Sequence, residues 1–323
     1  MASVNDGRKV SAIVVSYFTG PLLARAIASL KAQPEITEII IVDNGNWRGA
    51  VEAAVEANAG GAPVRIVSGH GNVGFATGCN LGAKEASGDF LLFLNPDAVM
   101  PQRGVAQFLR NGQTLSRPWV QGAKLINPDG AEQQGSRRMT LTPWRAFVEA
   151  TRLYRFAPRH PYFRRFNLHG DPCPDSVTPL PVISGACLFL PREDYFSIGG
   201  MDEEYFLHVE DVDFCLRFQN AGGAVFFNPN VEVLHHKSSS RVDPMRIEMR
   251  KTASMLRYFR QHFSDPYPAP FLWLVGAVLW SLCGLKVAGR FVNRSQAFVG
   301  FSARRGAGAL RRALQMNARR SVR

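Results

Sequence analysis

The chain has 323 residues, of which 46% are hydrophobic and 20% are charged, so it is long and apolar enough for one large or two ordinary globular domains. Its five cysteines are odd in number and widely spaced. This pattern indicates neither a disulfide framework nor a zinc ribbon, and it favours a reducing, cytoplasmic setting. Residues 1–9 are mostly polar and predict no secretory leader.

The formal net charge of +12 is concentrated at the carboxyl end. Residues 286–323 contain ten of the 38 Lys and Arg residues and no Asp or Glu, which leaves 28 basic against 26 acidic residues elsewhere. The main body is therefore nearly neutral, and the basic segment needs its own partner. Nucleic acid is disfavoured as that partner, because the arginines are not interleaved with aromatic side chains on which bases stack.

The first hundred residues alternate between predicted strands and predicted helices. Apolar runs predict buried strands at 10–17, 38–45, 64–67 and 90–94. The spacing of good helix formers predicts helices at 21–32, 51–58 and 76–86. The all-apolar run at 90–94 is typical of a central strand in a sheet covered on both faces. Together these elements predict a doubly wound α/β sheet.

Residues 69–74 satisfy the G-x-G-x-x-G pattern of dinucleotide-binding proteins. The pattern follows the third strand, whereas that fingerprint belongs to the first βα turn of its unit. Asp89, the acidic residue about twenty positions later, precedes a strand and would lie at the wrong edge of the sheet for a ribose. We therefore do not expect an NAD-type site.

Residues 101–180 are rich in Pro, Arg and aromatic residues and predict long loops. They could hold a mobile lid or an acceptor-binding insert, or their aromatic side chains could pack beneath the loops, and the sequence leaves these alternatives open. A strand follows at 182–190, interrupted by Gly185, where a missing side chain permits close approach to a ligand. The remaining predicted elements are a helix and two strands, at 209–220, 224–227 and 231–234.

Three ionisable residues follow predicted strands or begin a predicted helix. They are Asp97, Asp211 and His235, and we expect them at the edge where open α/β sheets collect their ligands. A carboxylate and an imidazole suit Mn²⁺ or Mg²⁺ when phosphate oxygens fill the other positions, and a carboxylate off the metal could serve as general base. The alternatives are a solvated turn for Asp97 and a favourable helix-dipole interaction for the acidic helix start.

A series of motifs covers residues 10–240 in order. They are Val15-Ser16-Tyr17, Val42-Asp43-Asn44, the segment 71–82 (Gly-Asn-Val-Gly-Phe-Ala-Thr-Gly-Cys-Asn-Leu-Gly), Leu94-Asn95-Pro96-Asp97, Ser184-Gly185-Ala186, Gly200-Met201-Asp202-Glu203, Glu210-Asp211-Val212-Asp213 and His235-His236. This series resembles glycosyltransferase family 2, whose members have the GT-A fold. The form of the segment 71–82, together with Asn-Pro-Asp, looks most like the bacterial rhamnosyltransferase branch of surface-polysaccharide assembly.

The resemblance implies a mixed, mostly parallel GT-A sheet flanked by helices. It also implies an inverting transfer of a sugar, with dTDP-L-rhamnose as the expected donor and a UDP-sugar as the alternative, onto a glycan or lipid-linked acceptor. Asp211 would be the general base, and Asp97 and His235 would hold Mn²⁺ or Mg²⁺ across the diphosphate. Asp43 would accept a hydrogen bond from a uracil or thymine ring. The residues implied in nucleotide binding are Tyr17, Asp43, Asn72, Gly74, Asn80 and Asn95.

The metal motif departs from the family pattern. The usual form is D-x-D, whereas this chain has Asn95 in the first position and Asp97 in the last. A neutral amide offers less charge to the cation, so the departure puts metal dependence in doubt more than the fold.

Two other classes remain open from the residues alone. A nucleotidyltransferase would share a nucleotide-binding sheet and a metal aspartate, but it would more often have a basic phosphate loop after the first strand, and residues 16–20 contain no Lys or Arg. A catalytically inert binding module is disfavoured because candidates for both the base and the metal ligands are present.

Residues 271–285 form an uncharged run that directly precedes the basic segment. The run is shorter than the roughly 20 residues that cross a bilayer, so it favours a helix in the membrane interface over a spanning one. Trp273 and Trp280 suit the headgroup boundary, and the cations suit anionic lipid. The alternative is a helix packed on the catalytic domain with a solvated tail.

These features predict a catalytic domain at 1–265, with a nucleotide-binding half at about 1–100 and an acceptor half at about 101–265. A helical, basic tail at 266–323 would hold the protein peripherally on the inner face of the cell membrane.

Overall fold

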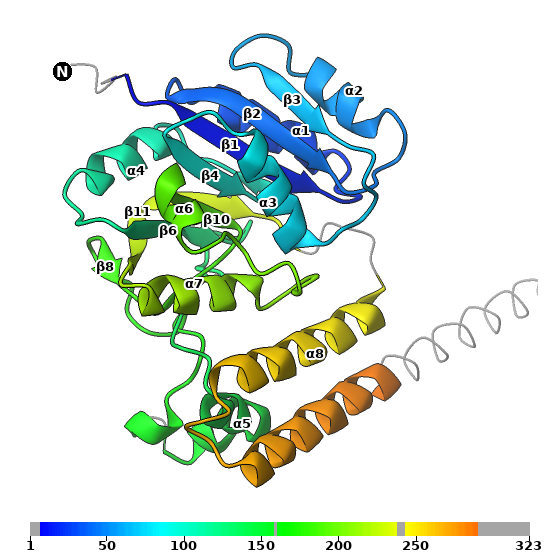
Figure 1. The fold of residues 1–323 in the computed structure, drawn as a ribbon, viewed down its shortest axis with the longest axis vertical. Coiled ribbons are helices and arrows are strands. Elements are labelled where there is room, and N and C mark those ends of the chain that lie inside the picture. The colour runs from blue at the N-terminus through cyan, green and yellow to red at the C-terminus, as the bar shows by residue number, and fades with distance from the viewer. Residues whose placement is uncertain (1–6, 158–159, 238–242, 290–323) are drawn as a thin grey trace, which may run out of the picture.

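The computed structural model describes residues 7–157, 160–237 and 243–289. A nine-stranded sheet runs through it. Its strands are β1 (Val10–Ser16), β2 (Ile36–Asp43), β3 (Val64–Val67), β4 (Phe90–Leu94), β5 (Ala98–Val99), β6 (Trp119–Ile126), β8 (Thr178–Pro179), β10 (Cys187–Pro191) and β11 (Ala224–His235). The strand order is β3-β2-β1-β4-β10-β6-β11-β5, with β8 paired to β11 (Figure 1).

The sheet is mixed, and most of its paired residues are in parallel register. Strands β3, β2, β1 and β4 are parallel, as are β6 and β11. Strand β10 is antiparallel to both β4 and β6, and β5 is antiparallel to β11. The mixed, mostly parallel sheet predicted above is therefore confirmed.

Helices cover both faces of the sheet (Figure 1). They are α1 (Leu22–Lys31), α2 (Ala50–Glu56), α3 (Phe75–Glu85), α4 (Gly104–Gly112), α5 (Pro143–Thr151), α6 (Arg192–Ser197), α7 (Glu210–Asn220) and α8 (Pro244–His262), with 3₁₀ turns η1 (Leu153–Arg155) and η2 (Pro161–Phe163). Side chains alternate along each strand, so Ile13 packs into the core that contains α3 and α7, and Val14 packs into the core that contains α1 and α4. The apolar strands are thus buried on both faces.

The segment 101–180 is more regular than predicted. It contains α4, α5 and β6, and β6 lies between β10 and β11 inside the sheet. The sequence hides this strand because the polar Gln121 is buried within it, where it donates to Phe108 O and accepts from Asn228. The prediction of loops is therefore wrong for α4, β6 and α5, while irregular stretches remain at 127–136, 152–157 and 160–177.

The strand predicted at 182–190 is two strands. Residues 182–183 form β9 (Val182–Ile183), which pairs with β7 (Arg137–Arg138) in a separate two-stranded sheet, and β10 begins at Cys187. The break falls at Ser184-Gly185-Ala186, the point where the glycine was expected to interrupt the strand. The two strands predicted at 224–227 and 231–234 are one strand, β11, with an irregularity in its register between Asn228 and Glu232.

The uncharged run near the carboxyl end belongs to a longer helix, here called the C-terminal helix (Ala269–Gly289). It has 21 residues, and within the described part of the chain it is the one helix long and apolar enough to cross a membrane. The expectation of a segment too short to span is therefore wrong in length, because the helix continues past both ends of the uncharged run. Of the ten basic residues counted at this end, Lys286 is described, and the rest lie outside the described residues.

The C-terminal helix lies antiparallel beside α8 (Figure 1). Val275 and Leu279 belong to the same buried core as α7 and α8. Nearer its end, Lys286 Nζ lies 3.0 Å from Glu248 Oε2. The opposite face, with Trp273 and Trp280, is exposed.

Candidate active site

Asp97 and His235 meet at the edge of the sheet although 138 positions separate them in the sequence. Asp97 follows β4, and His235 is the last residue of β11, which pairs with β5 immediately after Asp97. The two side chains are buried, and Asp97 Oδ1 lies 3.2 Å from His235 Nε2. The predicted meeting of these residues is therefore present in the structure.

Gln133 fixes the orientation of the His235 ring. Its Nε2 donates to Asn127 Oδ1 and to His235 O, so its Oε1 is left to accept from His235 Nδ1 at 2.6 Å. A proton on Nδ1 leaves the lone pair of the neutral ring on Nε2, which faces the Asp97 carboxylate and the Asn95 amide. An imidazole nitrogen with a free lone pair, 3.2 Å from a carboxylate oxygen, is a pair of donor atoms that fits a divalent cation.

The described residues contain no group of three His, Cys, Asp or Glu side chains placed to hold a metal ion. The protein would therefore offer Asp97 and His235, with Asn95 beside them, and the remaining positions would need oxygen atoms from a ligand such as a diphosphate. Metal binding through these residues stays a prediction.

Asp211 lies in the first turn of α7, where free backbone N–H groups favour a negative charge. Its Oδ2 accepts from Gly185 N–H at 2.9 Å and from Arg138 Nη2 at 2.6 Å. A Cβ at position 185 would lie 3.1 Å from Asp211 Cβ, so glycine is what allows this approach. Arg138 is itself anchored by a hydrogen bond to Ile183 O at 2.7 Å, across the β7–β9 pair.

The two neighbouring carboxyl groups at the start of α7 have different protonation behaviour. Burial raises the pKa of Glu210 to about 8, and the charge of Asp211 acts in the same direction. Burial also acts to raise the pKa of Asp211, but the charge of Arg138 and the hydrogen bonds from Arg138 and Gly185 more than offset it and hold the pKa below its ordinary value. At pH 7 Asp211 is ionised and Glu210 is mostly protonated.

The backbone before α7 is strained. His208 and Val209 both have left-handed φ values, of 69° and 75°. A left-handed φ costs about 1–3 kcal/mol per residue, and it is least favourable for a β-branched residue such as Val209. Such strained residues cluster at functional sites. Burial, together with the nearby charge of Lys251, lowers the pKa of His208 to about 4, so this imidazole is neutral.

Buried polar atoms without a hydrogen-bond partner in the described structure gather around Asp211. They are Arg138 Nε, His208 Nε2 and Glu210 Oε2. Leaving such atoms unpaired costs free energy, so a cluster of them beside a carboxylate favours a polar ligand that bears hydroxyl groups.

Asp43 ends β2 and is held in a tight turn. Its Oδ1 accepts from the backbone N–H groups of Gly45 and Asn46 and from Asn46 Nδ2. This leaves Oδ2 free of those contacts and fixes the side chain in place. The predicted contact with a nucleobase stays a prediction.

Tyr17 begins a chain of three aromatic rings after β1. Its ring meets that of Phe18, and Phe18 in turn meets Trp47, with centroid distances of 4.6 and 5.1 Å. Trp47 is 70% exposed although it is large and apolar, and it follows Asp43 closely in the chain. An exposed ring beside the predicted base-binding carboxylate is suited to stacking on a nucleobase.

The residues between β3 and α3 take different positions. Asn72 is exposed, and its Oδ1 accepts from Gly74 N–H. Gly74 has a left-handed φ of 89°, and a Cβ there would lie 2.5 Å from Phe206 O, so glycine is required. Asn80 is buried, and its side chain hydrogen-bonds to the backbone of Met201 and to the Glu203 carboxylate. Its predicted role in nucleotide binding stays a prediction.

The break between β9 and β10 connects the two parts of the site. Asn95 N–H donates to Ala186 O at 2.9 Å, and the neighbouring Gly185 N–H donates to Asp211. The structure therefore brings the Asn95–Asp97 segment, His235 and Asp211 to one region. Asp89, by contrast, precedes β4, and its carboxylate accepts from Lys9 N–H at the other end of that strand.

Sequence reasoning missed Arg138, Gln133 and Trp47. The first two lie in the segment that was taken for loops, where no periodicity singles out one Arg or Gln among many. An exposed aromatic residue close behind Asp43 was a usable signal for Trp47.

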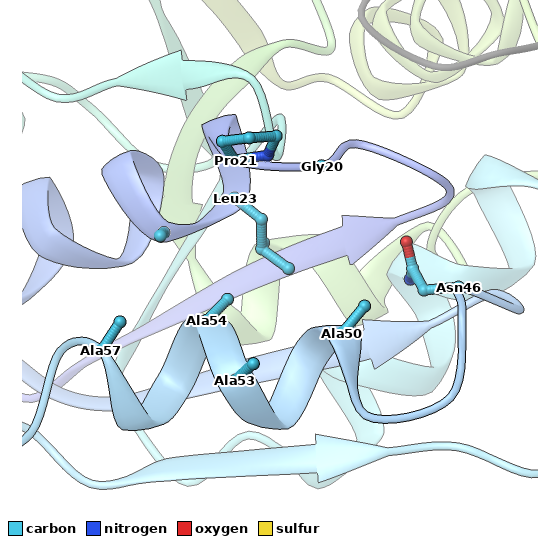
Figure 2. Close-up of a pocket in the computed structure, with 9 residues that line it drawn as sticks. Gly20, Pro21, Leu23, Asn46, Ala50, Ala53, Ala54 and Ala57 are labelled. Carbon is cyan, nitrogen blue, oxygen red and sulfur yellow. The ribbon is translucent and has the colours of Figure 1, made fainter.

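A cavity of about 270 Å³ lies between α1 and α2 (Figure 2). Its lining residues are Gly20, Pro21, Leu23, Ala24, Asn46, Ala50, Ala53, Ala54 and Ala57. None of Asp97, Asp211 and His235 contributes to it, and its lining carries no charge. The cavity is therefore separate from the candidate catalytic groups.

A family model described as Glycosyl transferase family 2 matches residues 11–164. The first half of this chain is thus similar to the family 2 glycosyltransferases. It is 29% identical over 274 residues to the N-acetylglucosaminyl-diphospho-decaprenol L-rhamnosyltransferase of Mycobacterium tuberculosis, an alignment that covers 81% of this chain and 87% of that protein. These similarities favour the glycosyltransferase alternative over the nucleotidyltransferase alternative.

Solved glycosyltransferase structures share the fold of this domain. GalNAc-T7 with UDP, GalNAc and Mn²⁺ matches with a TM-score of 0.55 at 16% identity, over 78% of this chain and 48% of that one. The mannosyltransferase PcManGT from Pyrobaculum calidifontis, in complex with GDP-Man and Mn²⁺, matches with a TM-score of 0.54 at 14% identity, over 84% of this chain and 68% of that one. The predicted GT-A fold is confirmed.

Proposed function

We propose that this glycosyltransferase inverts the configuration of the sugar it transfers, and that it moves L-rhamnose from dTDP-L-rhamnose onto a glycan or lipid-linked acceptor in bacterial surface-polysaccharide synthesis. The observation that carries the reaction type is Asp211, an ionised carboxylate that lies among unpaired polar atoms. It accepts from Gly185 N–H, and the neighbouring Ala186 O accepts from Asn95 N–H in the segment that leads to Asp97. The choice of donor rests on the similarity to an L-rhamnosyltransferase.

In this proposal Asp211 takes the proton from the acceptor hydroxyl as its oxygen attacks the anomeric carbon. The bond from that carbon to the diphosphate oxygen breaks on the opposite face, so a single displacement inverts the configuration. Gly185 N–H and Arg138 hold the Asp211 carboxylate in one orientation throughout. Glu210 is protonated at pH 7 and does not compete for the proton.

Asp97 and His235 would hold the cation, and the ring of His235 is already oriented for this by Gln133. When bound, a divalent cation neutralises charge on the diphosphate leaving group. Asp43 and Trp47 would position the base of the nucleotide, one by a hydrogen bond and the other by stacking.

A comparison of donors tests the proposal. Purified full-length protein is incubated with dTDP-L-rhamnose or with UDP-hexoses, and release of the nucleoside diphosphate is measured with and without candidate acceptors. We expect acceptor-dependent release from dTDP-L-rhamnose. Efficient use of UDP-hexoses with no turnover of dTDP-L-rhamnose would overturn the donor assignment while leaving the family intact.

Replacing Arg138 should move the pH dependence of turnover. In Arg138→Gln the charge that holds the pKa of Asp211 low is lost while burial remains, so that pKa rises and the base becomes protonated at a higher pH. The acid limb of the kcat profile should shift upward by about 1 pH unit or more, the usual effect of one close opposite charge.

Arg137→Gln is the matched control for this change. It breaks a comparably buried pair, Arg137 Nε to Glu132 Oε1 at 2.8 Å, one position away from Arg138 and without contact to Asp211. Its acid limb should stay where the wild-type limb lies. An unchanged limb in Arg138→Gln would show that Asp211 does not govern the profile.

We also propose that the protein binds peripherally to the inner face of the cell membrane. The C-terminal helix runs beside α8 from Gly276, near Leu256, to Lys286, which pairs with Glu248. α8 carries many charges, so a helix held along it cannot cross the hydrocarbon without burying them. The helix would instead lie in the interface with Trp273 and Trp280 toward the lipid.

A further inference from the structure

The segment after β7 is docked on the start of the C-terminal helix. We call it the α5 insert, residues 143–157 and 160–165, which contains α5, η1 and η2. The rings of Trp144 and Phe147 lie 6.3 and 6.1 Å from the ring of Phe271. Trp144 Nε1 also donates to Tyr162 O at 2.7 Å, which ties η2 to α5. The insert and the helix therefore form one structural unit at the same end of the molecule (Figure 1).

This unit carries most of the exposed large hydrophobic side chains. Of nine such residues in the described part of the chain, six lie on the insert or on the C-terminal helix. They are Phe156, Tyr162, Trp273, Leu274, Trp280 and Leu285. Phe156 is 85% exposed and Tyr162 is 70% exposed. Such a concentration on two adjoining elements marks an interaction surface.

The insert has a positive net charge. Residues 143–165 contain six Arg and one acidic residue, Glu149, which is paired with Arg165 at 2.6 Å. Arg152, which precedes η1, and Arg155, its last residue, are exposed, and Phe156 follows directly. Lys286 lies in the C-terminal helix, and nine further cations follow it in the sequence at 290–323.

We propose that the α5 insert is a second membrane-contacting element, and that it forms one lipid-binding face with the C-terminal helix. Aromatic side chains interleaved with arginines, with the one acidic side chain neutralised, match the chemistry of an anionic headgroup layer above an apolar interior. The proposal rests on the membrane association proposed above and adds a specific segment to it.

The position of the insert also relates the membrane to the active site. The insert begins at Pro143, shortly after Arg138, which contacts Asp211. If the insert binds lipid, β7 would therefore lie close to the membrane surface. This strand carries Arg138, which pairs with the proposed base Asp211. A lipid-linked acceptor would be presented at this end of the site.

The test uses the full chain and vesicles of phosphatidylcholine with about a third phosphatidylglycerol at moderate salt, with binding measured by sedimentation. Arg155→Gln combined with Phe156→Ser removes one exposed cation and one exposed ring from the insert. We expect vesicle affinity to fall at least tenfold, because the variant loses both a cation that would attract anionic headgroups and a ring that would enter the interface. Nucleoside diphosphate release with a water-soluble acceptor should be unchanged.

The matched control is Arg110→Gln combined with Phe196→Ser, which removes the same two side-chain types from exposed positions on α4 and α6. It should bind vesicles as the wild type does. Phe156→Trp is the conservative replacement and should bind at least as tightly as the wild type, because Trp favours the headgroup boundary.

The outcomes are distinguishable. Loss of binding in the insert variant alone supports the proposal. Equal binding by wild type and both double variants overturns the role of the insert and leaves the C-terminal helix as the membrane contact. If the wild type itself ignores the vesicles, the membrane association and the role of the insert both fail, while donor turnover still reports separately on the glycosyltransferase activity.

Discussion

Removing divalent cations with a chelator is expected to abolish sugar transfer or to lower it on the order of a hundredfold, and Mn²⁺ or Mg²⁺ should restore it. The physical reason is that His235 Nε2 lies 3.2 Å from Asp97 Oδ1, so that the two side chains would offer a cation two ligands. Neutralising charge on a diphosphate leaving group is worth several kcal/mol. Transfer is measured with and without chelator, followed by metal titration.

Three substitutions distinguish the proposed cation ligands from neighbouring residues. His235→Gln should reduce activity strongly at all metal concentrations, whereas His236→Gln, whose ring lies 3.5 Å from Arg25, should leave metal dependence unchanged. Asn95→Asp restores a second carboxylate beside His235 and should lower the metal concentration needed for half-maximal activity. Full activity in chelator would show that this enzyme does not depend on a metal, and Asp97 would then hold the sugar or the structure.

The sequence was sufficient to place Asp97 and His235 together, because both follow apolar strands and the carboxyl ends of parallel strands share one edge. The same logic located Asp211 at the start of a helix at that edge. These inferences depend on strong local patterns, the all-apolar run of β4 and the helical spacing of α7, which the rest of the fold preserves.

The contacts that surround Asp211 could not be predicted from the sequence. Arg138 reaches it through the two-residue pairing of β7 with β9, and neither strand has a periodicity that predicts a partner. The central strand β6 was missed for the related reason that a buried Gln interrupts its apolar pattern. Long-range pairing of short or polar strands is decided by tertiary contacts.

The length of the C-terminal helix was misjudged because charge was taken as its boundary. Lys286 lies within the helix, where its ammonium group pairs with Glu248, so the helix continues to Gly289. A long side chain at a helix surface can carry its charge away from an apolar face, and a single Lys does not end a helix.

Replacing Asp211 by Asn should lower turnover by about a hundredfold or more, the usual worth of general base catalysis. The amide has the same size and its oxygen can still accept from Gly185 N–H and from Arg138, so the structure and donor affinity should be largely kept. What is lost is the ionised group that accepts the proton of the acceptor hydroxyl.

Glu210→Gln is the matched control for this substitution. It makes the same chemical change one residue away, at a carboxyl group that burial keeps mostly protonated at pH 7 because its pKa is about 8. Since a neutral amide replaces a mostly neutral acid, turnover should stay within a few-fold of the wild type.

The measurement that tests the central claim most directly is single-turnover transfer by both variants at pH 7 with saturating donor and acceptor, together with donor affinity by calorimetry. We predict a loss of about a hundredfold or more in Asp211→Asn, nearly normal transfer in Glu210→Gln, and similar donor affinity in both. Nearly normal transfer in Asp211→Asn, or an equally large loss in Glu210→Gln, would contradict the role of Asp211 as the base.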